Sequence, residues 1–266
     1  DTADIYGARG GSEEQLGEIL GQRRKDIVLA SKFGMAMSDD GTKIGASRRY
    51  IMSAVEDSLT RLKTDWIDLY QLHQEDPLTP MEETLRALDD LVTQGKVRYI
   101  GCSNLKSWQV AESQWISKSS SITRFVSCQD EYNILNREVE RELIPAMQRY
   151  GCGLLPYFPL ASGLLTGKYQ SNKMPEGARL TDMPTFANRV YVTDENFSIV
   201  EKLNAFAKQH GHSLLELAFS WMAARPTTAS IIAGATKPEQ IDANVDAIRW
   251  KMTPEQISEV DNLSAK

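Results

Sequence analysis

The residues best suited to chemistry stand where predicted strands end, or just outside the first predicted helix. Asp1 and Tyr6 precede that helix, Lys32 lies near the end of the segment 27–33, and His73 follows the segment 65–72. A phenol has an unperturbed pKa of about 10, and a neighbouring ammonium group lowers that pKa by favouring the phenolate. A carboxylate can keep the ammonium charged, and an imidazole can polarise or orient a carbonyl group. A Tyr, a Lys, an Asp and a His that meet in one pocket therefore predict an acid–base device acting on a carbonyl oxygen.

Each of these polar groups also has a structural interpretation when it is taken singly. Lys32 can be a solvated strand end, and His73 can be a hydrogen-bonded structural histidine. Ser103 and Asn104 can cap the helix that follows them, and Gln129 can satisfy backbone groups. The functional interpretation therefore depends on a fold that brings the strand ends to one face.

The elements that must position these groups alternate between strands and helices. Apolar segments predict strands at 27–33, 65–72, 97–103, 125–129, 153–158 and 228–233. Amphipathic segments predict helices at 12–20 (with Ser12 as N-cap), 47–63, 80–94, 107–117, 139–150, 196–209, 214–224 and 238–246, and a last helix from 253. This alternation predicts right-handed βαβ units and a parallel sheet. A doubly wound sheet and a (β/α)8 barrel without its first two strands both fit this alternation. No G-x-G-x-x-G motif follows any strand, which argues against a doubly wound sheet of the Rossmann type.

Composition and charge narrow the class of protein. The chain has 266 residues, of which 41% are hydrophobic and 25% charged, and no linker divides it, which predicts a single domain over 1–266. The net charge of −6 argues against a nucleic-acid or anionic-membrane surface, and no apolar run is long enough to span a bilayer. The 3 Cys lack motif spacing, and no signal peptide opens the sequence, so we expect buried reduced thiols in a cytoplasmic protein. Neither His210 nor His212 predicts a metal site, and the oligomeric state is not predicted.

Several motifs together resemble the aldo-keto reductase family over essentially the whole chain. The opening DTADIYG, followed by SEEQLGEIL, is similar to the N-terminal signature of that family, with ASKFG and LYQLH further along. The resemblance implies a (β/α)8 barrel and a catalytic tetrad of Asp1, Tyr6, Lys32 and His73. The family also has a segment before the signature, which holds the first strand and most of the second. The expectation is thus an N-terminally truncated barrel that lacks the first strand and most of the second, and that folds poorly when it is expressed alone.

The resemblance also implies where a nicotinamide cofactor binds. GCSN and Gln129 match residues that hold the carboxamide, YFPLASGLLTGKY matches the segment that stacks on the nicotinamide and wraps the pyrophosphate, and IIAGATKPEQIDAN matches the segment that grips the adenosine end. The implied cofactor-binding residues are Ser103, Asn104, Gln129, Tyr157, Phe158, Pro159, Leu160, Ser162, Lys168, Arg179, Gly234, Thr236, Lys237, Gln240 and Asn244. Gly234 and Gln240 replace a Lys and an Arg of many family members, and Ala243 stands where an acid often contacts adenine. The Gly-Ala-Thr form of this adenosine-end segment is closer to the aryl-alcohol-dehydrogenase-like and potassium-channel β-subunit branches of the family.

The activity that the resemblance implies is reversible reduction of an aldehyde or ketone by NADPH, with NADH as a possible substitute. Tyr6 would be the general acid, and the partner a small-molecule carbonyl compound rather than nucleic acid or a membrane. Two alternatives remain open: a cofactor-sensing regulatory subunit with weak redox activity, and an inactive gene fragment.

Overall fold

The computed structural model describes residues 1–169, 174–177, 179–182 and 191–265, with only the backbone of Arg179 and Asp182. Its strands are β1 (Ala30–Phe33), β2 (Ile67–Leu72), β3 (Val97–Ser103), β4 (Phe125–Gln129) and β5 (Gly153–Leu154). Its α-helices are α1 (Tyr6–Leu20), α2 (Arg48–Leu62), α3 (Met81–Thr93), α4 (Ser107–Ser120), α5 (Leu143–Tyr150), α6 (Arg179–Asp182), α8 (Asp194–Gln209), α9 (Leu214–Ala223), α10 (Pro238–Asp246) and α11 (Pro254–Leu263). Short 3₁₀ helices are η1 (Gly21–Asp26), η2 (Glu138–Glu140), η3 (Ala161–Thr166) and η4 (Ala247–Arg249).

The chain divides into two compact units, which are described separately. The first unit contains Asp1–Gln129 and Glu142–Gly153, and the second contains Asp130–Arg141 and Leu154–Lys266. The interpretation of 1–266 as a single domain remains a prediction.

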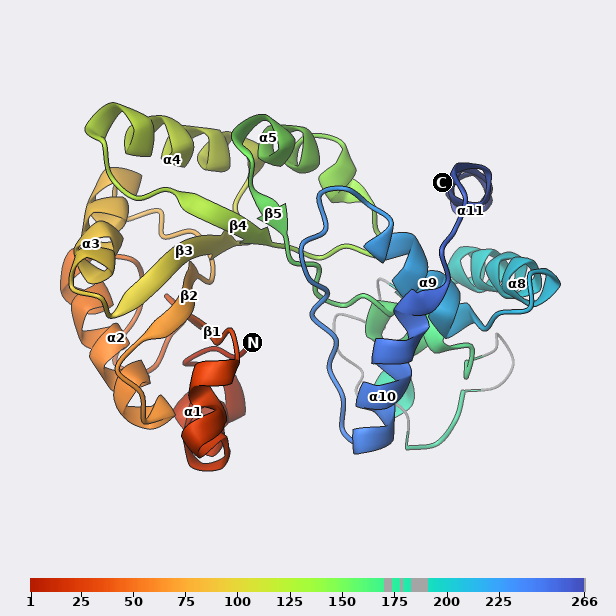
Figure 1. The fold of residues 1–266 in the computed structure, drawn as a ribbon, viewed down its shortest axis with the longest axis horizontal. Coiled ribbons are helices and arrows are strands. Elements are labelled where there is room, and N and C mark those ends of the chain that lie inside the picture. The colour runs from red at the N-terminus through yellow and green to blue at the C-terminus, as the bar shows by residue number, and fades with distance from the viewer. Residues whose placement is uncertain (170–173, 178, 183–190, 266) are drawn as a thin grey trace. The chain divides into compact units, whose positions relative to one another are not determined.

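The strands form one sheet in the order β1-β2-β3-β4-β5, and the β1–β2, β2–β3 and β3–β4 pairs are parallel. Figure 1 shows α2, α3, α4 and α5 on the outer side of this sheet. Strand order that follows chain order, with a helix after each strand, is the pattern of a barrel rather than of a doubly wound sheet. The fold is therefore α/β and consistent with a (β/α)8-barrel-like architecture, as predicted.

Local signals explain the two helices that follow β1 and β2. The Ser47 hydroxyl accepts a hydrogen bond from the Tyr50 backbone N–H at 3.3 Å and so caps α2, and Lys63 ends that helix in a left-handed conformation. In α3, the positions predicted to face inward are all fully buried, namely Leu85, Leu88 and Leu91. Burial of this apolar stripe holds α3 against the sheet.

Three predicted strands differ from the structure. The strand predicted at 27–33 begins only at Ala30, after η1, and Val28 is 81% exposed. The strand predicted at 153–158 ends at Leu154, because Pro156 lacks a backbone donor and Phe158 has a φ of 51°. The segment 228–233 is not a strand: Thr228 only bridges Leu154, with isolated hydrogen bonds from the backbone N–H groups of Ala229 and Ile232.

Two predicted helix starts are also corrected. The helix predicted at 139–150 is divided into η2 and α5, because Pro145 is tolerated only in a first helical turn. The helix predicted at 12–20 is part of α1, which has non-helical backbone from Gly7 to Gly10. Ser12 does not cap it; its hydroxyl instead accepts a hydrogen bond from the Thr2 hydroxyl at 2.8 Å.

The second unit has its own core. Trp221 of α9 and Tyr132 are both fully buried, with ring centroids 5.3 Å apart. The Trp221 indole N–H donates to Asp261 of α11 at 2.9 Å, which ties two helices together. The described cysteines Cys102, Cys128 and Cys152 are free and buried, as predicted.

Candidate active site

Lys32 is the centre of the polar cluster in the first unit. It comes from β1, its side chain is fully buried, and its ammonium group donates to Asp1 Oδ2 at 2.7 Å and to the Thr2 carbonyl at 2.9 Å. Burial lowers the pKa of Lys32, and the neighbouring Tyr6 and Asp4 oppose that change. The Asp1 carboxylate and the Thr2 carbonyl therefore stabilise a cation that water cannot reach.

Tyr6 lies beside this ammonium group and is 41% exposed. The Lys32 Nζ atom is 3.5 Å from the Tyr6 hydroxyl oxygen and 4.8 Å from the centroid of its ring. The backbone turn that follows has positive φ from Gly7 to Gly10, and a Cβ on Gly7 would lie 2.6 Å from the Ser12 backbone nitrogen. Glycine at position 7 thus lets the turn present a phenol to solvent directly above a buried cation.

His73 completes the group from the end of β2. Its ring meets the Tyr6 ring edge-on, with centroids 5.6 Å apart and an interplanar angle of 84°. Burial, with a smaller contribution from Lys32, lowers the pKa of His73 to about 4. The imidazole is therefore neutral near pH 7, and its Nδ1 atom has no hydrogen-bond partner among the described residues. A neutral imidazole next to a phenol can donate a hydrogen bond to a substrate carbonyl oxygen or accept one from a product hydroxyl.

Ser103, Asn104 and Gln129 connect the next two strand ends to this cluster. The Ser103 hydroxyl donates to the Gln129 carbonyl at 2.7 Å, and the Asn104 amide donates to the His73 carbonyl at 3.0 Å. The Gln129 amide donates to Asp1 Oδ1 at 3.0 Å, so Asp1 bridges β1 and β4. Asn104 has a φ of 58°, a left-handed conformation that asparagine tolerates well.

Two further residues contact the cluster that the sequence did not indicate. Gln71 is fully buried, lies opposite Lys32 in the sheet register, and points its amide nitrogen at Asp1 Oδ1 from 3.5 Å. The alternation of inward positions along β2 could have identified it, because residues 69, 71 and 73 lie on one face. Asp4 is 1% exposed, and burial together with the Glu13 carboxylate raises its pKa to about 7. No sequence signal separates Asp4 from an exposed turn residue.

In the second unit, the segment after β5 forms a turn that carries a hydroxyl and a cation suited to an anion. Phe158, Ala161, Ser162 and Gly163 all have positive φ, and the backbone N–H groups of Ala161 and Gly163 donate to carbonyl groups within the turn. The buried Ser162 hydroxyl has no hydrogen-bond partner among the described residues. The Lys168 ammonium group lies 3.7 Å from where a Cβ on Gly163 would be. A hydroxyl without a partner and a cation in one turn fit a diphosphate.

The other residues predicted in this segment lie beside the turn. The Tyr157 backbone N–H donates to the Asp130 carbonyl at 3.0 Å, and the rings of Tyr157 and Phe158 meet edge-on with centroids 5.2 Å apart. Pro159 is buried and Leu160 half-buried. The side chain of Arg179 lies outside the described residues.

The residues predicted at the adenosine end gather around the start of α10, also in the second unit. The Thr236 backbone N–H donates to Gln240 Oε1 at 2.7 Å, and the Thr236 hydroxyl donates to the same atom at 3.2 Å. Lys237 is the exposed N-cap residue of α10, and Gly234 is exposed. Asn244 is half-buried on α10. The Gln240 side chain thus folds back over the helix start.

The structure brings the predicted residues together in separate groups. The first unit gathers Asp1, Tyr6, Lys32, His73, Ser103, Asn104 and Gln129 into one hydrogen-bonded cluster. The remaining described residues lie in the second unit, in or beside the turn after β5 and on or just before α10. Across the described ranges, no three His, Cys, Asp or Glu side chains are placed to hold a metal ion. No helix in the described part of the chain has the length and apolarity to cross a bilayer.

Comparison with known proteins gives the same family over the whole chain. The family model described as Aldo/keto reductase family matches residues 1–265. A probable voltage-gated potassium channel subunit beta from Oryza sativa subsp. japonica is 36% identical over 269 residues, covering 98% of this chain and 81% of the relative. L-glyceraldehyde 3-phosphate reductase from Escherichia coli (strain K12) is 31% identical over 274 residues, covering 98% of this chain and 78% of the relative. Versiconal hemiacetal acetate reductase from Aspergillus parasiticus is 32% identical over 277 residues, covering 97% of this chain and 80% of the relative.

Proposed function

Because this chain belongs to the aldo/keto reductase family, we propose that it reduces aldehydes and ketones reversibly to alcohols, with NADPH as the preferred cofactor and NADH as a possible one. The family and its reductase-named relatives support an oxidoreductase that acts on carbonyl compounds. The observation that carries the proposal is the fully buried Lys32 ammonium group, held between the Asp1 carboxylate and the Tyr6 hydroxyl. When bound, the nicotinamide supplies a hydride to the carbonyl carbon.

Tyr6 supplies the proton that the carbonyl oxygen needs. Tyr6 is partly exposed, whereas Lys32 has no exposed surface, so Tyr6 can reach a substrate and Lys32 cannot. When the phenol gives up its proton, negative charge develops on the Tyr6 oxygen 3.5 Å from the ammonium group. The ammonium group is already in place and stabilises this charge without reorganisation, which is the electrostatic form of transition-state stabilisation.

His73 and Asp1 have positioning and electrostatic roles in this proposal. A neutral His73 next to Tyr6 orients the substrate oxygen by a hydrogen bond and adds no second cation. Asp1 accepts from both Lys32 and Gln129, and so fixes the ammonium group relative to the strand ends. The small-molecule carbonyl compound would approach Tyr6 from its exposed side.

The residues that would hold the cofactor are those predicted from the sequence. Ser103, Asn104 and Gln129 offer amide and hydroxyl groups to the carboxamide, and Tyr157 offers a ring face to the nicotinamide. The Ser162 hydroxyl and the Lys168 ammonium group would take the pyrophosphate. Thr236, Lys237, Gln240 and Asn244 would take the adenosine end. A cytoplasmic location, where reduced nicotinamide cofactors are available, is part of the proposal.

A second candidate function is that of a cofactor-sensing regulatory subunit with slow redox chemistry. Three relatives are named as potassium channel β subunits, at 35–36% identity. In that case the same cluster would report the redox state of a bound nicotinamide to a partner protein.

Steady-state oxidation of NADPH with a panel of aromatic and aliphatic aldehydes separates these functions. An enzyme turns over many times per chain and shows a substrate-dependent rate with saturation. A single slow turnover per chain, with tight cofactor binding, would support the regulatory subunit. Cofactor binding without any substrate-dependent oxidation of NADPH would overturn the proposed enzyme.

A further inference from the structure

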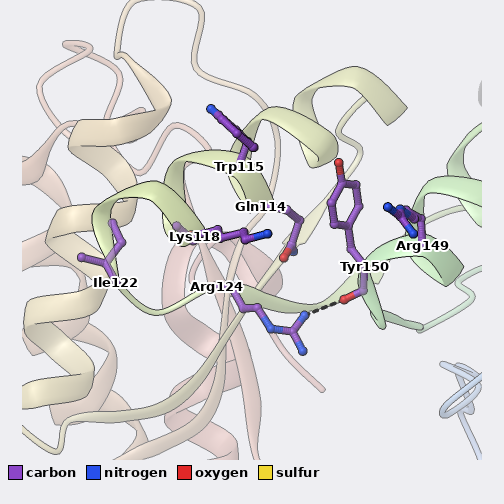
Figure 2. A pocket seen from close by; sticks show the side chains of 8 residues that line it. Gln114, Trp115, Lys118, Ile122, Arg124, Arg149 and Tyr150 are labelled. Atoms are coloured by element: carbon purple, nitrogen blue, oxygen red, sulfur yellow. Dashed lines mark hydrogen bonds between the residues drawn. The ribbon is translucent and has the colours of Figure 1, made fainter.

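A groove on the outside of the first unit has no part in the proposed reaction. It lies where α4 ends, where the chain enters β4, and where α5 ends, and its volume is about 520 Å³. Figure 2 shows the side chains that line it, among them Gln114, Trp115 and Lys118 from α4. We call it the α4–α5 groove. Its volume is within the range of pockets that bind small molecules, about 300–1,000 Å³.

The α4–α5 groove is positively charged in a chain whose net charge is −6. Lys118, Arg124 and Arg149 line it, and no carboxylate does among the described residues. Some exposed cations of this unit are neutralised by a carboxylate, as Arg48 is by Asp90 at 2.5 Å. In the described part of the chain, neither Lys118 nor Arg149 forms an ion pair, and both are exposed. The groove therefore concentrates positive charge that the protein itself does not neutralise.

Helix dipoles give a competing reason for two of these cations. Lys118 is in the last turn of α4 and Arg149 in the last turn of α5, where carbonyl groups present negative partial charge. Each helix end carries roughly half an elementary charge. Two such ends offset about one of the cations, which leaves an excess of about two positive charges. Arg124 uses only Nη1 to reach a helix end, by donating to the Tyr150 carbonyl at 2.8 Å.

Aromatic side chains and a fixed polar group complete the lining. Trp115 is 67% exposed and Tyr150 is 37% exposed, so both rings offer surface to a ligand. Gln114 is buried, and its amide nitrogen donates to the Phe125 carbonyl at 2.8 Å and to Cys152 Sγ at 3.3 Å. These contacts hold the Gln114 side chain in one orientation. A flat ring with an anionic substituent matches aromatic walls combined with cations.

We propose that the α4–α5 groove is a binding site for a small aromatic anion, of the class of aryl phosphates and aromatic carboxylates. The cations bind the charged group, and the exposed rings of Trp115 and Tyr150 pack against the ligand ring. The site lies in the outer helical layer of the first unit, away from the strand ends that carry Lys32 and His73. It is independent of the proposed reductase activity.

Isothermal titration calorimetry of the full chain with phenyl phosphate, benzoate, inorganic phosphate and benzyl alcohol tests this proposal. We compare the wild type with the double variant Lys118→Gln/Arg149→Gln and with Lys208→Gln. Lys208 is a matched control because it is an exposed cation in the last turn of another helix, α8. The three substituted positions are exposed, so circular dichroism should show unchanged folding.

The expected result is binding of phenyl phosphate and benzoate that the double variant weakens roughly tenfold or more and Lys208→Gln leaves unchanged, because two charge-assisted contacts are lost. Benzyl alcohol should bind far more weakly than either anion. Trp115→Ala should weaken the binding of phenyl phosphate and leave the binding of inorganic phosphate unchanged, which identifies the aromatic contribution to affinity. Equal affinities of the wild type and the double variant would overturn the proposal, as would inorganic phosphate binding as tightly as phenyl phosphate.

Discussion

The Lys32 ammonium nitrogen lies 3.5 Å from the hydroxyl oxygen of Tyr6, although the lysine is fully buried and the tyrosine is 41% exposed. The two residues come from different elements, β1 and the start of α1, and the ammonium group contacts the phenol from its buried side. A substrate can therefore contact the phenol from solvent while the cation stays out of contact with water. In this low-dielectric position, the interaction of the cation with charge on the phenol oxygen is stronger than it would be at the surface.

Tyr6→Phe should abolish most of the turnover while leaving cofactor binding nearly intact. Tyr6 is exposed where Lys32 and His73 are buried, so a substrate can contact it, and general acid catalysis contributes about 10²- to 10⁴-fold. The measurement is kcat for an aromatic aldehyde together with a fluorescence titration of NADPH. If the variant kept more than about a third of the wild-type rate, another group would have to be the proton donor.

Lys32→Met should lower kcat by a similar factor, of the order of 10²- to 10⁴-fold, since it removes the charge that stabilises the phenolate. Lys43→Met is the control, because Lys43 is an exposed cation paired with Asp57 at 3.1 Å on the same unit. Thermal melting of both variants reports their folding. A Lys32→Met variant that folds and keeps the wild-type rate would show that Tyr6 needs no cation.

His73 should not titrate between about pH 5.5 and 8, because its pKa is lowered to about 4. The unfolded chain, with a His pKa of 6.5, binds more protons than the folded chain between about pH 4 and 6.5. The free energy of unfolding should therefore decrease as pH falls through this window, by at most about 3 kcal/mol from this group. NMR titration of the imidazole and denaturant unfolding of the wild type and His73→Gln check this. A midpoint near 6.5 in the folded protein would contradict it.

Asp4 should produce the opposite pH dependence. Its folded pKa is about 7 against 3.8 for an unperturbed group, so the folded chain binds more protons between about pH 4 and 7. The free energy of unfolding should decrease as pH rises through this window, by up to about 4 kcal/mol. Asp4→Asn removes the carboxyl group that must ionise while buried beside Glu13, so it should be more stable than the wild type at pH 8 and similar at pH 4. Unfolding in urea at both pH values measures this, and a variant that is less stable at pH 8 would refute it.

Lys237→Ala should weaken the binding of NADPH and hardly affect the binding of NADH, because only NADPH carries the 2′-phosphate. The Gln240 side chain accepts both hydrogen bonds from Thr236, which leaves the exposed Lys237 as the cation at the start of α10. A hydrogen bond to a charged group contributes roughly 1.5–3 kcal/mol, which corresponds to about a tenfold to hundredfold loss of affinity. Fluorescence titration with both cofactors is the measurement, with Lys251→Ala as the control. Equal losses for NADPH and NADH, or a wild type that prefers NADH, would overturn this assignment.

Elements whose signals are local could be predicted from the sequence. Ser47 and Thr253 are N-caps in the structure, and α2, α3, α10 and α11 follow the predicted ranges closely. A capping hydroxyl and an apolar stripe act within a few residues, so they leave a readable pattern. The errors in the strands at 27–33, 153–158 and 228–233 have a different cause, because a strand is defined by the partner that it pairs with. Local composition does not show that Thr228 has only a single bridge to Leu154.

For the candidate active site, the sequence by itself determined which residues are available: a Tyr, a Lys, an Asp and a His at or near strand ends. Only the tertiary structure decided that they meet, because the sheet register brings Lys32 opposite Gln71 and His73 close to Tyr6. Burial decided their protonation, since desolvation depends on every neighbour that excludes water and not on sequence spacing. The same reason explains why the burial of Asp4 and the positively charged α4–α5 groove were not predicted. Both depend on residues that are distant in the chain and adjacent only in the folded protein.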